Sequence, residues 1–227
     1  MSLPKPYYDE GGITIYHGDC RDVLPGLAPA DLLLTDPPYG VGLGSHADAH
    51  ESRPGVGLKK QAYASYDDTK ENFAAIVCPA IVMALGIVKR GVVFCAGKNL
   101  WLLPQASAVS AIFLPAGQGR TPWGFQNLAH FALYGTAPNL NLGAKNTAIA
   151  STASSEKNGH PCPKPIEWMT WLVSLGSLTG ETVLDPFMGS GTTLRAAKDL
   201  SRKAIGIEIE ERYCEIAAKR MAQGVLL

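Results

Sequence analysis

Short apolar runs that end in an acidic residue dominate the hydrophobic pattern of the chain. The run Asp31–Asp36 contains three consecutive leucines and predicts a short strand buried on both faces, as in a parallel sheet covered by helices. Thr182–Asp185 and Ala204–Glu208 repeat this arrangement near the other end of the chain. Ligands of such sheets bind beyond the carboxyl ends of the strands. The three acids therefore predict a binding site at one edge of an α/β sheet.

Other apolar patterns predict the elements between these strands. Apolar residues at helical spacing predict a buried helix from Asn72 to Lys89, kinked by Pro79. A glycine turn leads into an amphipathic helix from Thr192 to about Leu200. Further strands are predicted at 91–96, 111–114 and 130–135.

The turn after the first strand, Thr35–Gly40, carries the residues best suited to chemistry. Pro37 and Pro38 lack an N–H and have φ near −65°, so the turn is stiff. The carbonyl of Pro37 is left as an acceptor. Together with the Asp36 carboxylate and the Tyr39 ring, this carbonyl suits an amino group on a flat ring. The alternative is a Pro-Pro turn in which Asp36 is a cap and Tyr39 packs in the core.

A glycine-rich loop follows the second strand and admits a ligand close to its backbone. It consists of Phe187, Met188, Gly189, Ser190, Gly191 and Thr192. Leu194 stands where a dinucleotide fingerprint has its third glycine, and the lysine of a Walker loop is absent. The loop is therefore poorly built for a pyrophosphate. Glu208 is well placed to accept both hydroxyls of a ribose, which favours an adenosine ligand without phosphates.

These residues together resemble the amino-methylating DNA methyltransferases that use S-adenosylmethionine. The match covers nearly the whole chain and follows the beta-group order, a circular permutation in which the catalytic Asp-Pro-Pro-Tyr precedes the cofactor loop. The resemblance implies a Rossmann-like methyltransferase fold of the α/β class. Its mostly parallel seven-stranded sheet has one antiparallel strand, for which 130–135 is the candidate. It also implies S-adenosylmethionine as cofactor and catalysis by Asp36, Pro37, Pro38 and Tyr39.

The resemblance extends to further cofactor contacts. Ile13–Asp19 resembles the strand whose terminal acid binds the adenine amine of the cofactor, and Glu208–Arg220 resembles the closing strand-helix unit. His160–Pro165 resembles the motif before the helix that precedes the cofactor loop, although Cys162 and Pro163 replace the more usual Thr and Gln. The implied cofactor-binding residues are Asp19, Asp36, Lys164, Asp185, Phe187, Gly189, Ser190, Gly191, Thr192 and Glu208.

The chain length of 227 residues suggests a single catalytic domain, 1–227. Residues 40–70 have weak periodicity and exceed the usual length of a loop, which favours a mobile DNA-contacting segment over simple disorder. Residues 136–159 form a short polar insert in place of a full target-recognition domain. The net charge is zero, so phosphate binding would depend on local charge, or on a homodimer. The candidates for DNA contact are Arg53, Lys59, Lys60 and Arg120.

Composition excludes several other classes of protein. No apolar run reaches transmembrane length, so no membrane association is expected. Five cysteines lie far apart without a Cys-x-x-Cys motif, which favours a reduced cytoplasmic chain and no metal site.

The expected reaction is methyl transfer from S-adenosylmethionine to the exocyclic amine of a flipped adenine in DNA. The preference for adenine rests on the resemblance, because an acid at the position of Asp36 is typical of adenine enzymes, whereas cytosine enzymes usually have Ser. A cytosine N4 methyltransferase, an RNA or small-molecule substrate, and an inactive nucleic-acid-binding relative remain alternatives. A cognate restriction endonuclease is a further candidate partner.

Overall fold

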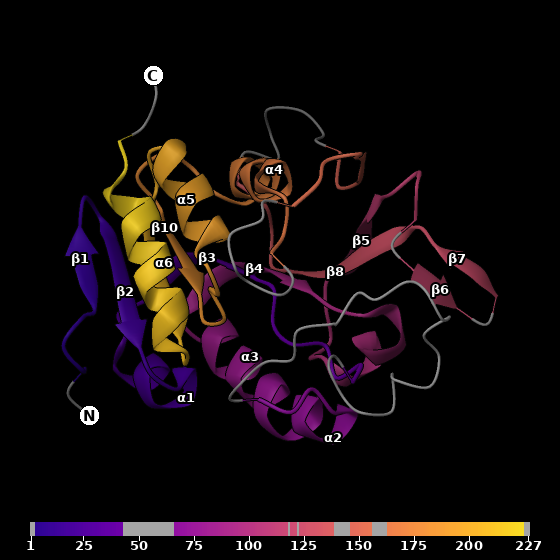
Figure 1. Ribbon diagram of the computed structural model, residues 1–227, viewed down its shortest axis with the longest axis horizontal. Coiled ribbons are helices and arrows are strands. Elements are labelled where there is room, and N and C mark those ends of the chain that lie inside the picture. Colours follow the sequence, from indigo (N-terminus) through magenta and orange to yellow (C-terminus); the bar gives the residue numbers. More distant parts are fainter. Residues whose placement is uncertain are drawn as a thin grey trace, which may run out of the picture.

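The computed structural model describes residues 3–42, 66–117, 119–121, 123–138, 146–155 and 163–224. One mixed sheet of nine described strands runs through the molecule in the order β1-β2-β11-β10-β3-β4-β8-β5-β9 (Figure 1). The strands are β1 Tyr8–Glu10, β2 Ile13–His17, β3 Ala30–Thr35, β4 Val88–Phe94, β5 Ala108–Phe113, β8 Leu128–Tyr134, β9 Ile149–Ala150, β10 Thr182–Asp185 and β11 Lys203–Glu208. A separate hairpin pairs β6 Gly119–Thr121 with β7 Gly124–Gln126.

The strand directions confirm the predicted α/β class. Strands β2, β11, β10, β3 and β4 are parallel neighbours, and β8 is antiparallel to both β4 and β5, as predicted for 130–135. The predicted count of seven strands, with one antiparallel, was too low. The two-residue turn Gly11–Gly12 folds β1 back against β2 as a second antiparallel strand. At the other edge β9, from the predicted polar insert, pairs with β5.

Helices cover both faces of the sheet and bury the alternating side chains of its strands. On one face α4 Ile166–Gly176, α5 Thr192–Asp199 and α6 Glu211–Ala222 pack over residues such as Leu32 and Leu34 (Figure 1). The opposite face, which includes Leu33, is covered by α1 Cys20–Val23, the 3-10 turn Leu24–Gly26 and α3 Cys78–Leu85. No helix of the described ranges is both long and apolar enough to span a membrane.

The predicted helix 72–89 is shorter and less regular than its sequence suggested. It consists of α2 Lys70–Asn72, a π-helical segment Phe73–Val77 and α3, and it ends at Leu85 because Val88–Phe94 is taken into the sheet as β4. Pro79 lies in the first turn of α3, where its missing N–H is least costly. The irregular part of this helix, the π-helical segment Phe73–Val77, therefore lies before Pro79, whereas the sequence predicted a kink at the proline itself.

The parallel strands direct their carboxyl ends toward one edge of the sheet. Asp36 follows β3, Asp185 ends β10, Glu208 ends β11 and Asp19 lies two residues beyond β2. Because β2, β11, β10 and β3 are consecutive neighbours, the four acids of these strand ends lie along one side of the molecule.

Candidate active site

The Asp36–Tyr39 turn is built around the Asp36 carboxylate. Its Oδ1 accepts a hydrogen bond of 2.5 Å from the Tyr39 hydroxyl, and its Oδ2 forms an ion pair of 2.5 Å with Lys164 Nζ. The side chains of Asp36 and Lys164 are only 18% and 13% exposed, so this pair is far less screened than a surface salt bridge. The ammonium group also lies 5.1 Å from the ring centroid of Tyr39 and 5.6 Å from that of Phe94.

Residues distant in sequence hold the backbone of this turn. The Asp68 carboxylate accepts the N–H of Gly40 at 2.6 Å and that of Val41 at 3.2 Å. Asn99 donates its amide to the carbonyls of Tyr39 and Gly40. Gly40 has φ +66°, and a Cβ there would lie 2.7 Å from Phe73 Cβ, so only glycine fits.

The carbonyl oxygen of Pro37 differs from those of Tyr39 and Gly40, which both accept a hydrogen bond from Asn99. Within the described ranges no group donates a hydrogen bond to it. The acceptor that the proline pair was predicted to leave is therefore present next to the Asp36 carboxylate.

The glycine loop between β10 and α5 is held by one buried acid, Asp185, and one half-buried acid, Glu208. Asp185 Oδ1 accepts from Thr35 Oγ1 at 2.6 Å and from the N–H of Phe187 at 3.1 Å. Glu208 accepts the N–H of Gly189 at 3.0 Å on one oxygen and that of Glu210 at 2.8 Å on the other. Burial raises the pKa of Asp185 to about 6 and that of Glu208 to about 7, against the lowering effect of these hydrogen bonds.

Contacts from the last helix complete the loop. Arg220 Nη1 donates to the carbonyl of Ser190 at 2.9 Å. Gly191, the N-cap of α5, has φ +80°, and a Cβ at this position would lie 2.9 Å from Ala217 Cβ. The close approach of α6 therefore requires glycine at this end of the loop.

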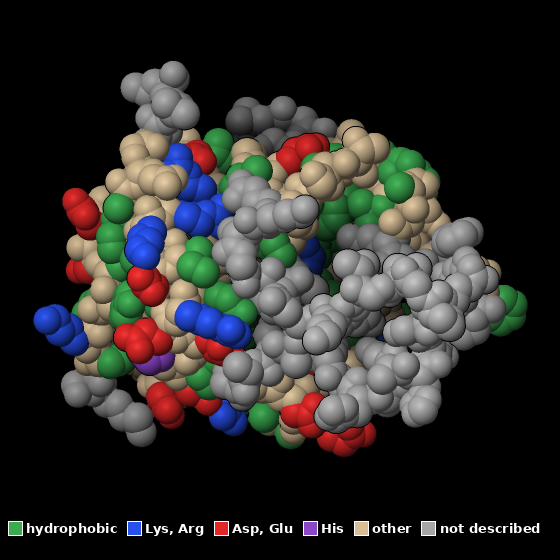
Figure 2. Space-filling model, viewed as in Figure 1, with side chains coloured by type: hydrophobic (Ala, Val, Ile, Leu, Met, Phe, Trp, Pro, Cys, Tyr) green, Lys and Arg blue, Asp and Glu red, His purple; other side chains and the backbone are tan. Residues whose placement is uncertain are grey.

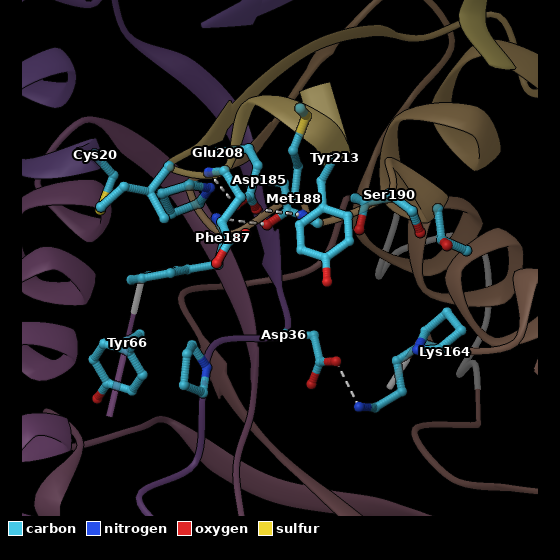
Figure 3. A pocket seen from close by; sticks show the side chains of 18 of the residues that line it. Cys20, Asp36, Tyr66, Lys164, Asp185, Phe187, Met188, Ser190, Glu208 and Tyr213 are labelled. Carbon is cyan, nitrogen blue, oxygen red and sulfur yellow. Dashed lines mark hydrogen bonds and ion pairs between the residues drawn. The ribbon is translucent and has the colours of Figure 1, made fainter. Parts of the chain in front are cut away.

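A first cavity lies between this loop and the Asp36 turn (Figure 3). Nine of the ten predicted cofactor residues line it, and these are Asp19, Asp36, Lys164, Asp185, Phe187, Gly189, Ser190, Thr192 and Glu208. Gly191 is the exception, since it faces Ala217. In Figure 3 Glu208, Asp185 and Phe187 lie at one end of the cavity, and the Asp36–Lys164 pair lies at the other.

A second cavity of about 530 Å³ lies beyond the same turn. Pro37 and Tyr39 line it, whereas Pro38 lines the first cavity, and Asp36 and Lys164 border both. The remaining wall is formed in part by Leu114, Ala116, Gly117, Trp168 and the segment Ser151–Ser155. The turn therefore separates two cavities and presents the Asp36 carboxylate to each.

Asp19 has a local partner that its sequence position did not indicate. Its carboxylate accepts the backbone N–H of Arg21 at 2.9 Å and pairs with the Arg21 guanidinium at 2.6 Å. These guanidinium hydrogen bonds hold the pKa of Asp19 below its usual value, although burial opposes them. An ionised acid thus lies at the rim of the first cavity.

Three of the four residues predicted to contact DNA lie outside the described ranges. Arg53, Lys59 and Lys60 lie outside them, and Arg120 is placed only by its backbone, on β6. On the face seen in Figure 2, basic side chains lie among acidic ones over α5 and α6.

No described group of three or more His, Cys, Asp or Glu residues is suited to a metal ion. Cys20 lines the first cavity, but burial raises the pKa of its thiol to about 12, so it is not a thiolate at neutral pH.

Several site residues were not found from the sequence. Asp68 lies in the segment 40–70, and its carboxylate accepts the N–H of Gly40 from 28 positions away. Asn99 and Ser151 belong to segments without a recognisable motif, and only the fold brings them to the cavities. Tyr66 and Met169 also line the first cavity.

Comparison with known proteins now places this geometry in a family. Residues 88–219, more than half of the chain, match the family model N6_N4_Mtase, described as DNA methylase. The chain belongs to this DNA methylase family. The family predicted from the motifs is thereby confirmed, and with it S-adenosylmethionine as the methyl donor.

Individual relatives of this DNA methylase agree with the assignment. Type II methyltransferase M2.DpnII of Streptococcus pneumoniae is 25% identical over 255 residues, covering 96% of this chain and 93% of its own. The crystal structure of the M1.HpyAVI-SAM complex matches with a TM-score of 0.65 at 23% identity, covering 93% of this chain and 100% of that one. PvuII DNA methyltransferase, described as cytosine-N4-specific, matches with a TM-score of 0.69 at 15% identity, covering 98% and 91%. Both structural matches confirm the fold.

Proposed function

We propose that this DNA methylase transfers a methyl group from S-adenosylmethionine to the exocyclic N6 amine of an adenine flipped out of DNA. The observation that carries the proposal is that Asp36 lines both cavities, while Pro37, with its carbonyl free as an acceptor among the described residues, lines the second. The first cavity holds the methyl donor, and the second holds the flipped base.

The residues of the first cavity fit the methyl donor. Each Glu208 oxygen accepts one backbone N–H, which leaves a lone pair on each for the two ribose hydroxyls. Asp19 accepts the adenine amine, and Phe187 and Met188 supply apolar contact for the ring. Lys164 uses one N–H on Asp36, so its others are available to the carboxylate of the donor. When bound, the donor supplies an electrophilic methyl group on a sulfonium.

The target amine is a poor nucleophile because its lone pair is delocalised into the ring. Its two N–H groups donate to Asp36 and to the carbonyl of Pro37, which favours a pyramidal nitrogen with its lone pair toward the first cavity. In the transfer the N–C bond would form as the C–S bond breaks, the electron pair of that bond would stay on the sulfur as a neutral thioether, and the nitrogen would release one proton to solvent. Asp36 stabilises the positive charge that develops on this nitrogen. Tyr39 stacks on the base and offsets part of the cost of flipping, by about 1–3 kcal/mol.

DNA binding is assigned to residues 40–70 and to the insert 136–159 of a single catalytic domain, 1–227. Arg53, Lys59, Lys60 and Arg120 contact phosphates. Because the net charge is zero, a homodimer would supply more local charge than a monomer. A cytoplasmic location and a cognate restriction endonuclease complete the proposal.

The test is transfer of labelled methyl to DNA, followed by nucleoside mass spectrometry. N6-methyladenine as the main product supports the proposal, with Asp36→Ala as the inactive control. Cytosine N4 is the second candidate, favoured by the likeness of the fold to the PvuII enzyme. N4-methylcytosine as the main product would overturn the choice of base and leave the donor site intact.

A further inference from the structure

Ser151 is the most deeply buried hydroxyl in the wall of the second cavity. It follows β9 directly, and its N–H donates to the carbonyl of Phe113 at 2.9 Å, which fixes the backbone at the sheet edge. The residue is 5% exposed and lines the same cavity as Asp36 and Pro37.

The hydrogen bonds that the Ser151 hydroxyl already makes show which further hydrogen bond it can form. Its Oγ accepts from the indole Nε1 of Trp168 at 2.9 Å and from the N–H of Ala153 at 3.1 Å. A serine hydroxyl has two acceptor lone pairs and one O–H donor. Two N–H donors therefore occupy both lone pairs, and only the O–H remains. No described residue accepts a hydrogen bond from it.

A buried donor without a partner is costly, so its place at a cavity wall indicates a ligand that supplies the acceptor. The cavity fits a flat base in volume, and its lining also includes Asp36 and Pro37, whose acceptors suit an amine. The ring nitrogens that flank the amine of adenine, N1 and N7, are acceptors. A base held by its amine at Asp36 therefore presents an acceptor edge to the rest of the wall.

We propose that Ser151 is a specificity-determining residue whose hydroxyl donates a hydrogen bond to a ring nitrogen beside the amine of the flipped base. The inference rests on the proposed adenine methylation. Trp168 and Ala153 direct the hydroxyl, because their N–H groups leave it a single free role. A contact at N1 would also select against guanine and thymine, which carry an N–H at the corresponding ring position.

The test exchanges single atoms on both sides of the contact. Duplexes contain adenine, 1-deazaadenine or 7-deazaadenine at the methylated position, once that position has been mapped. Wild type and Ser151→Ala are compared by kcat/KM for methyl transfer. For each enzyme the loss is the fall in kcat/KM from adenine to the analogue. On one of the two analogues this loss should be roughly tenfold larger for wild type than for Ser151→Ala, because only wild type has a hydrogen bond to lose. The comparison cancels the intrinsic change in amine reactivity, because both enzymes meet the same analogue.

Two control variants separate recognition from structure. Trp168→Phe removes one of the two donors that direct the hydroxyl but keeps the hydroxyl itself, so the analogue effect should become smaller than in wild type and stay larger than in Ser151→Ala. Ser154→Ala removes an exposed hydroxyl from the same cavity wall and should leave the analogue effect of the wild type unchanged.

The outcomes are distinct for the two proposals. Equal losses by wild type and Ser151→Ala on both analogues would overturn the role of Ser151 while adenine methylation stands. Wild type that fails to methylate ordinary adenine would instead refute the proposed function.

Discussion

Affinity for S-adenosylmethionine should depend on pH through Glu208. Both oxygens of this carboxyl already accept backbone N–H groups, and burial raises its pKa to about 7 from an ordinary 4.5. A ribose diol donates two further hydrogen bonds, which an ionised carboxylate accepts more strongly than a protonated one. Binding should therefore favour the ionised form and release a proton near neutral pH.

The size of the effect follows from the fraction of ionised Glu208. With a pKa of about 7, roughly a tenth of the groups are ionised at pH 6 and roughly nine tenths at pH 8. If only the ionised form binds, affinity rises about tenfold across this range, or about 1.4 kcal/mol. Stability of the empty protein changes in the opposite direction. The pKa of Glu208 is higher in the folded protein than in the unfolded chain, so its protonated form favours the folded state. This contribution to the free energy of unfolding is complete below about pH 4.5 and is lost as the pH rises through 7.

Isothermal titration calorimetry at pH 6, 7 and 8, in buffers of different ionisation enthalpy, measures both affinity and proton release. Glu208→Gln is the matched control, because it cannot ionise and its amide has only one acceptor oxygen for two backbone donors. Its affinity should fall roughly tenfold or more at pH 8 and lose most of its pH dependence. Residual dependence at lower pH would belong to Asp185, whose pKa is about 6. A wild type with constant affinity and no proton release between pH 6 and 8 would refute the reasoning.

Three other predictions concern the turn and the DNA contact. Asp36→Ala should abolish methyl transfer and change donor affinity only a few-fold, measured by calorimetry; a fully active variant would end the proposed mechanism. Asp68→Ala leaves two backbone N–H groups without their acceptor, so thermal unfolding should show a loss of about 1–3 kcal/mol and kcat should fall; an unchanged kcat would show that the turn is held without it. Reversal of Lys60 to Glu should flatten the salt dependence of DNA affinity by roughly one unit of log–log slope, measured by fluorescence anisotropy, and a slope equal to that of wild type would exclude a phosphate contact there.

The main strands and the acids at their ends could be predicted from the sequence, since each is a local pattern. Leu32–Leu34 is apolar because both faces of β3 are covered, and Asp36 follows directly after the last residue of this strand. The edge strands were missed for a physical reason. β9 is two residues long and lies in a polar segment, so only its pairing with β5 makes it a strand.

The supports of the site could not be predicted because they are tertiary. Asp68 reaches the Gly40 N–H, and Asn99 reaches the Tyr39 carbonyl, across 28 and 60 positions of the chain. Lys164 was placed at the cofactor through the resemblance alone. Its ion pair with Asp36 depends on how α4 packs beside β3 and β4, which no local pattern encodes.

The wall shared by the two cavities has a pharmacological consequence. Asp36, Pro163 and Lys164 border both spaces, so the two proposed ligands would meet at these three residues. A synthetic molecule that joins an adenosine group to a purine through a short linker would fill both spaces at once. Binding of its second half would be intramolecular, with an effective concentration in the millimolar range for a short flexible linker. Such an inhibitor would compete with the donor and with DNA, and a change in the outer DNA-contacting surface would do little to defeat it.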